Sequence, residues 1–250
     1  MKNKKGQITI FIILALIIVV GFILVFLVMN PPEVKIIDNK DPQAFIEACT
    51  KEAVEEAIDI ISKSGGDINP KGFLSHKDED ITYLCYTNDI YFPCTNQRPL
   101  LIEHIENEIT KHITPIVSDC FFSLKQKIEK THAVETSGME IKTTLHTKSI
   151  SVKIDKKFKI IRDGESTDIN TFRMRFVHPI YDLAKIAVEI SNQESRYCNF
   201  DELGYMIVYP KYDITKFITG EADVIYTIED ISTKNKFKFA IRSCKLPAGF

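Results

Sequence analysis

The sequence lacks the short motifs by which many nucleotide-binding and hydrolytic enzymes are recognised. It contains no G-x-G-x-x-G stretch, no phosphate-binding loop and no G-x-S-x-G, and its ten glycines are too few for glycine-rich phosphate cradles. It also has no C-x-x-C pair of the kind that binds zinc, and no N-x-S/T site for N-glycosylation. We therefore expect no enzyme activity, no cofactor and no metal site.

A surplus of charge is also missing. The 250 residues include 32 basic and 34 acidic side chains, for a formal net charge of −2. A general nucleic-acid binder needs a basic face to neutralise phosphates, so we expect no nucleic-acid partner. A mean hydropathy of −0.05 excludes a protein with many membrane spans, but that average conceals an uneven distribution of apolar residues.

Residues 8–29 form one long run without a charged side chain. As a helix, these residues extend about 33 Å, enough to cross a hydrocarbon core of about 30 Å. Lys2, Lys4 and Lys5 precede this run, and the charged residues at 33–41 sum to −1. The positive-inside rule therefore predicts one transmembrane helix, a cytoplasmic N-terminus and a C-terminal domain outside the cell membrane.

The start of the chain indicates how this helix is processed. An ordinary secretory signal has a shorter apolar region and a cleavage site of small residues, neither of which is found here. Instead, Lys4-Lys5-Gly6-Gln7 directly precedes the apolar run. This arrangement resembles the class III signal peptide of archaeal type IV pilin-like proteins, and the opening is also similar to those of surface proteins from archaea with small genomes.

The resemblance implies that a membrane signal peptidase cuts between Gly6 and Gln7 and leaves the apolar helix attached. It also implies protein partners or self-assembly through that helix. A plain signal anchor that keeps its lysines fits the same residues, and both interpretations stay open. The cytoplasmic tail is too short for a signalling domain of its own.

The order of segments predicts an α+β fold: an N-terminal transmembrane helix and an extracytoplasmic domain of two to three helices packed on antiparallel sheet. The expected parts are a basic tail (1–7), the span (8–29), a linker (30–41), a helical part (42–130) and a β-rich part with one helix (131–250). Beyond residue 30 the formal charge is about −5, because 29 basic residues face all 34 acidic ones.

Local patterns predict the elements of this domain. Asp41-Pro42 begins an amphipathic helix that Gly65-Gly66 ends, and a second helix from about residue 98 to 129 is kinked or divided by Pro115. A third helix spans about 179–193. Strands are expected at 81–86, 90–94, 139–147, 149–161, 172–177, 204–209, 212–218, 222–230 and 236–243, with 67–80 as polar loop.

All six cysteines follow the apolar run, which indicates an oxidising compartment and three disulfides. Fifteen pairings exist for six cysteines. Cys85 and Cys94 lie on one predicted hairpin, and Cys49 and Cys120 lie on the apolar faces of two predicted helices. Cys198 and Cys244 then remain as the third pair. Free buried thiols are the alternative interpretation.

The strongest cluster of chemically active side chains is His104, Glu108 and His112, spaced four residues apart. On one helix these side chains form a strip that could share a cation, but such strips are usually solvated, and the spacing differs from H-E-x-x-H. His178 is interpreted as a helix-start residue. Residues 78–80 are acidic but lack the spacing of a calcium loop.

Together these observations predict a membrane-anchored surface protein with a structural, adhesive or assembly role, pilin-like if Gly6/Gln7 is cleaved. The alternative is a ligand-binding or envelope-assembly module with a single span. An extracytoplasmic enzyme is the least supported class, since it would need a deep pocket that combines His104 or His178 with convergent carboxylates.

Overall fold

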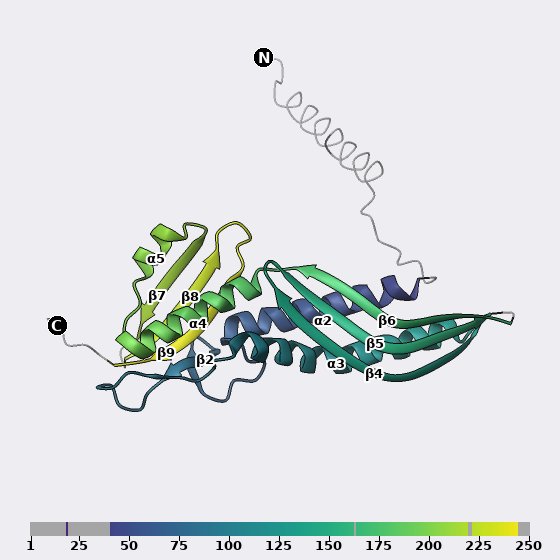
Figure 1. Ribbon diagram of the computed structural model, residues 1–250, viewed down its shortest axis with the longest axis horizontal. Helices are drawn as coiled ribbons and strands as arrows, with labels where there is room; N and C mark the ends of the chain where they lie inside the picture. The colour runs from purple at the N-terminus through teal and green to yellow at the C-terminus, as the bar shows by residue number, and fades with distance from the viewer. Residues whose placement is uncertain (1–18, 20–40, 163, 220–221, 245–250) are drawn as a thin grey trace, which may run out of the picture. The chain divides into compact units, whose positions relative to one another are not determined.

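The computed structural model describes Val19 and residues 41–162, 164–219 and 222–244 (Figure 1). Residues 41–250 form one compact unit. Val19 apart, the predicted span at 8–29 lies outside the described residues, as do Gly6 and Gln7. Within the described ranges, no helix combines the length and the hydropathy needed to cross a membrane.

Two long helices, α2 (Pro42–Ser64) and α3 (Leu101–Ile128), pack against each other and carry much of the core. The Asp41 carboxylate accepts the Gln43 N–H at 2.9 Å, and Gly65 ends α2 with a left-handed φ of 77°, as the sequence predicts. Pro115 lies inside α3 but does not divide it. The buried stripe of α3 continues on both sides of Pro115, and this packing holds the helix together.

One sheet is a local meander of three long strands, β4 (Ala133–His146), β5 (Ser149–Arg162) and β6 (Glu165–Val177). All its pairings are antiparallel. One face packs on the helices, where the ring of Phe172 meets that of Phe121 from α3 at a centroid distance of 5.0 Å. In Figure 1 this sheet runs alongside α2 and α3.

The second sheet joins distant parts of the chain in the order β1-β2-β9-β8-β7, and the short β3 (Thr95–Asn96) pairs with β2. Its other strands are β1 (Phe73–His76), β2 (Glu79–Tyr86), β7 (Tyr212–Ile218), β8 (Asp223–Asp230) and β9 (Lys236–Arg242). Helix α4 (Ile180–Tyr197) contacts β2, β8 and β9. Because β2 and β9 run parallel, this sheet is mixed, and the antiparallel pairing that the sequence predicts holds for its other strand pairs.

Three local predictions are wrong. Residues 202–208 form helix α5 (Glu202–Val208) instead of a strand, because Asp201 caps the helix by accepting the Gly204 N–H at 3.0 Å. Residues 90–94 form a turn and irregular loop instead of a strand, and the segment after Cys94 that pairs with β2 is β3. The loop predicted at 67–80 contains β1 and the start of β2. The described residues thus contain four complete helices instead of two or three.

All six cysteines are paired in three disulfides. The pairs are Cys49–Cys120, Cys85–Cys94 and Cys198–Cys244, with Cα–Cα distances of 6.4, 5.4 and 5.5 Å. These are the pairs that the sequence favours. The first joins α2 to α3, the second joins β2 to the segment before β3, and the third joins the end of α4 to the segment after β9.

Candidate functional site

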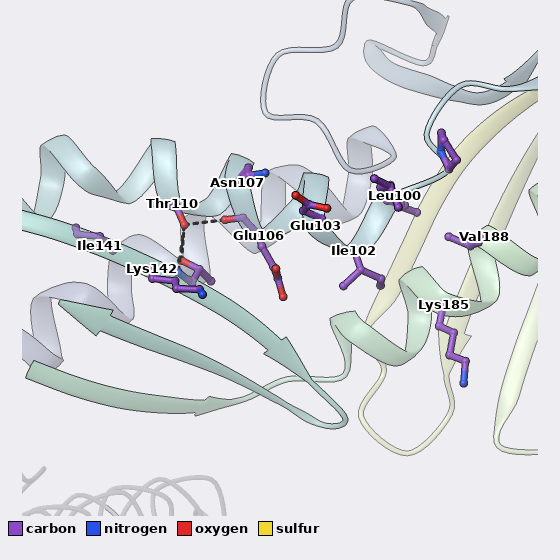
Figure 2. Close-up of a pocket in the computed structure, with 13 residues that line it drawn as sticks. Leu100, Ile102, Glu103, Glu106, Asn107, Thr110, Ile141, Lys142, Lys185 and Val188 are labelled. Carbon is purple, nitrogen blue, oxygen red and sulfur yellow. Dashed lines mark hydrogen bonds between the residues drawn. The ribbon is translucent and has the colours of Figure 1, made fainter. Parts of the chain in front are cut away.

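A hollow of about 610 Å³ lies between the start of α3, strand β4 and helix α4 (Figure 2). Its wall combines apolar side chains with charged ones, chiefly Leu100, Ile102, Val188, Glu103, Glu106 and Lys185. The Glu106 carboxylate is not free, since it accepts the Leu145 N–H at 2.8 Å. Neither His104 nor His178 lines this hollow.

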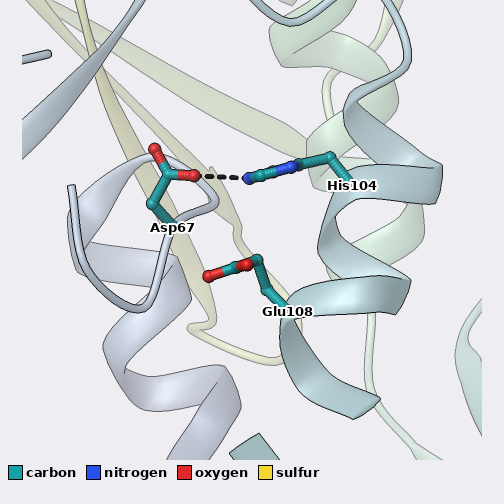
Figure 3. Close-up of side chains that lie close together, drawn as sticks. All are labelled: Asp67, His104 and Glu108. Carbon is teal, nitrogen blue, oxygen red and sulfur yellow. Dashed lines mark hydrogen bonds and ion pairs between the residues drawn. The ribbon is translucent and has the colours of Figure 1, made fainter. Parts of the chain in front are cut away.

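The closest grouping of metal-binding side chains in the described part of the chain is Asp67, His104 and Glu108 (Figure 3). Their ligand atoms all lie within 4.8 Å of one another. His104 and Glu108 project from α3, while Asp67 comes from the loop after α2. The strip predicted on α3 is therefore completed by Asp67 and not by His112, whose Nε2 lies 3.7 Å from a Glu56 carboxylate oxygen.

The carboxylates of this cluster already have partners. The buried Asp67 accepts hydrogen bonds from His104, from the Thr82 hydroxyl at 2.8 Å and from the Arg98 guanidinium at 3.3 Å. Glu108 accepts the Ile68 N–H at 3.0 Å and a Lys111 ammonium hydrogen at 3.3 Å. The Arg98 guanidinium beside the Asp67 carboxylate would repel a metal cation. The network therefore fits a structural role better than a metal site.

The electrostatics of Asp67 agree with that interpretation. Burial by itself raises the pKa of this carboxyl, but the hydrogen bonds from His104 and Thr82 and the charge of Arg98 outweigh it, so the pKa lies below its usual value. Asp67 is thus an anion at neutral pH, and it joins the loop after α2 to α3 and β2. No sequence pattern marks Asp67, because it lies 37 residues from His104.

A second hollow, about 580 Å³, does contain His178 together with the carboxylates of Glu55, Asp59 and Glu79. Both ring nitrogens of His178 are occupied: Nδ1 accepts the Ile180 N–H at 3.1 Å, and Nε2 donates to Asn235 at 2.9 Å. Burial lowers the pKa of His178, against the opposing effects of Asn235 and Glu55. His178 therefore lies just before α4, where it accepts the N–H of the first helical residue, and as the neutral imidazole it ties that helix to the β8–β9 turn.

One buried polar pair lies in the mixed sheet. The Tyr226 hydroxyl on β8 donates to Glu194 of α4 at 2.5 Å, and both residues are almost fully buried. Burial and the Glu194 charge raise the pKa of Tyr226 far above its usual value. The Lys216 ammonium lies 3.7 Å from the same carboxylate. The pair links α4 to the sheet, and no sequence motif marks it.

Comparison with protein-family models, with curated proteins and with solved structures finds no match to this chain. The functional argument therefore depends on its own residues.

Proposed function

We propose that this chain is a membrane-anchored protein whose disulfide-bonded α+β domain lies outside the cell, in a structural, adhesive or assembly role. One combination of features carries the proposal. A 22-residue uncharged run, with three lysines before it and a net charge of −1 over residues 33–41 after it, precedes a compact unit in which every cysteine is paired. Structural disulfides persist in oxidising compartments and are rare in a reducing cytosol.

Surface labelling of intact cells tests the location. Lys111 and Lys234 are suitable reporters, with side chains 74% and 72% exposed. A membrane-impermeant amine reagent should modify both lysines in intact cells, and a cytosolic protein in the same sample should stay unmodified. Labelling of Lys111 and Lys234 only after lysis would contradict the proposal.

For the processing step, we propose cleavage between Gly6 and Gln7 with the apolar run retained. The local sequence supports it, since the basic residues, the glycine and the uncharged run are in the order that the pilin-like leader requires. Gly6→Leu is the matching variant. It should block the cut and add six residues to the mature chain, as read by mass spectrometry, and an unchanged mature N-terminus would exclude this site.

A ligand-binding module is the second candidate, and the hollow beside α3, β4 and α4 favours it. Its volume of about 610 Å³ is in the range of small-molecule sites, and its wall is mainly apolar with a few charged groups. Val188→Trp would fill the hollow without changing charge. If the module binds a small apolar molecule there, this variant should lose binding to a hydrophobic reporter dye, while Val177→Trp on the exposed end of β6 should retain it.

A further inference from the structure

The outward face of the three-stranded sheet carries two adjacent rows of polar and basic side chains. In one row, Lys142, Lys153 and Arg173 lie directly opposite one another on β4, β5 and β6. Thr144, Ser151 and Arg175 form the next row. Their neighbours along the strands, such as Val152 and Met174, are buried on the inner face, so the two rows point away from the core.

This arrangement is unfavourable for the sheet itself. Like charges directly opposite each other on neighbouring strands destabilise the pairing. Within the described part of the chain, only Lys153 of these cations has a carboxylate within 4.0 Å, Asp155 at 2.5 Å. Lys142, Arg173 and Arg175 are exposed and have no ion pair within the described ranges. Within the described ranges the fold thus keeps three exposed cations without a direct ion pair, although Asp155, which pairs with Lys153, also attracts the charge of Arg173.

The same residues surround a hollow of about 440 Å³. Its wall consists of the four cations, the two hydroxyl residues Thr144 and Ser151, and the backbone neighbours Val152 and Met174. No carboxylate lines it. In a domain whose formal charge is about −5, the sheet face therefore presents a concave, basic and hydrogen-bonding surface.

The spacing of the cations indicates the shape of the ligand. Neighbouring strands lie about 4.8 Å apart, so the row from Lys142 to Arg173 spans roughly 10 Å, and the second row lies roughly 7 Å further along the strands. A single small anion contacts only part of such an array. A linear chain with anionic groups at intervals of about 5 Å can contact the whole row, with guanidinium groups suited to bidentate binding of oxyanions.

We propose that this surface, which we name the basic sheet face (Lys142, Thr144, Ser151, Lys153, Arg173 and Arg175), binds an anionic polysaccharide that carries sulfate or phosphate groups. The cations bind the oxyanions, and the two hydroxyls donate to sugar oxygens. Binding of such a polysaccharide would account for an adhesive role. The inference rests on the proposed location outside the cell.

The test uses full-length protein in nanodiscs of zwitterionic phosphatidylcholine, titrated with fluorescent dextran sulfate. The variant K142Q/R173Q/R175Q removes three cations from the basic sheet face and keeps Lys153, which is paired with Asp155. The control K51Q/K63Q/K111Q removes three exposed lysines from α2 and α3, so both variants change the net charge equally.

We expect dextran sulfate to bind in a salt-dependent manner. At roughly fivefold per cation near an anionic surface, the triple variant should bind about a hundredfold more weakly, and the control should change by less than about threefold. Equal losses in both variants, or no binding of dextran sulfate by the wild type, would overturn the proposal. Tight binding of single-stranded DNA at equal charge would overturn the polysaccharide class, and full competition by millimolar inorganic sulfate would overturn the linear ligand.

Two further measurements keep these outcomes distinct. Because the triple variant removes repulsion between strands, its melting temperature should equal or exceed that of the wild type. If it fails to fold, Arg175→Gln alone, on the edge strand β6, should still weaken binding about fivefold. Labelling of Lys111 and Lys234 on intact cells reports the location independently, so failure of sugar binding and failure of the surface location give different results.

Discussion

The two sheets of this domain are assembled in opposite ways. Strands β4, β5 and β6 follow one another along the chain and pair with their immediate neighbours, with no disulfide among them. The mixed sheet instead pairs β2 with β9, which lies some 150 residues later in the sequence, and two of the three disulfides flank it. The local sheet is joined by its two hairpins and packs on the helices without a cross-link, whereas disulfides and a buried polar contact accompany the mixed sheet.

The largest effect is expected when a disulfide beside the mixed sheet is removed, since the three-stranded sheet contains none. C198S/C244S opens a loop of 46 residues and should lower the free energy of unfolding by about 4 kcal/mol in the chain-entropy model. Urea denaturation measures this loss, and C85S/C94S, with a separation of 9 residues, is the matched control at about 2.5 kcal/mol. Hydrogen exchange should show the loss of protection in α4 and β9. Equal loss in β4–β6 would contradict the comparison.

The next largest effect is expected at Asp67, whose carboxylate joins the loop after α2 to α3 and to β2. Asp67→Asn removes charge-assisted hydrogen bonds to His104 and Arg98 and should cost about 2–3 kcal/mol. Asp59→Asn breaks only an exposed pair with Lys63 and should cost at most about 0.5 kcal/mol. Urea denaturation midpoints of the two variants measure the difference. Equal midpoints would show that Asp67 does not stabilise the fold more than the exposed pair does.

The lowered pKa of Asp67 also has a consequence for pH. The stability it provides is fully present above its unfolded pKa of about 3.9 and is lost as pH falls through the lower folded value. The melting temperature of the wild type should therefore fall steeply below about pH 4. The Asp67→Asn variant should show a shallower drop, and an identical acid limb in both proteins would argue against the assignment.

A smaller effect tests the buried pair of the mixed sheet. Tyr226→Phe leaves Glu194 without its hydroxyl donor and should lower stability by about 2 kcal/mol. Tyr205→Phe is the control, because its hydroxyl makes only a long, exposed contact of 3.4 Å with Glu189, and we expect a change below about 0.5 kcal/mol. Thermal unfolding of both variants measures the difference. A neutral Tyr226→Phe would mean that apolar packing alone holds α4 to this sheet.

The smallest expected effect is the pH dependence of stability due to His178, at the end of the three-stranded sheet. His178 follows β6 and contacts Asn235 in the β8–β9 turn. Because its folded pKa lies below the unfolded value of about 6.5, the unfolded chain binds more protons just below that pH, so stability falls as pH drops from 7 toward 5. His178→Gln keeps an amide that can donate to Asn235 and should remove this slope. A slope that persists in the variant would assign it to other groups.

The contrast between the sheets also explains how much the sequence could predict. Period-two patterns and turn residues identified β5 and parts of β4 and β6, and the caps at Asp41 and Gly65 set the ends of α2. These features depend on neighbouring residues. The parallel pairing of β2 with β9 depends on contacts between distant segments, for which one sequence has no signal.

The candidate sites follow the same rule. His104 and Glu108 are visible as a helical strip, but their true partner, Asp67, comes from another element. The basic sheet face is likewise invisible until the register sets Lys142, Lys153 and Arg173 side by side. Helix α5 was missed because its apolar residues suit a strand as well as a helix, and the cap at Asp201 decides between them.

The central claim is an anchored chain with an oxidised outer domain, and the intact mass of the protein purified from native membranes tests it most directly. The account predicts a mature chain that begins at Gln7, keeps the apolar run and is lighter by six hydrogens because of three disulfides. A chain that begins beyond Asn30, or one with six free thiols, would contradict it.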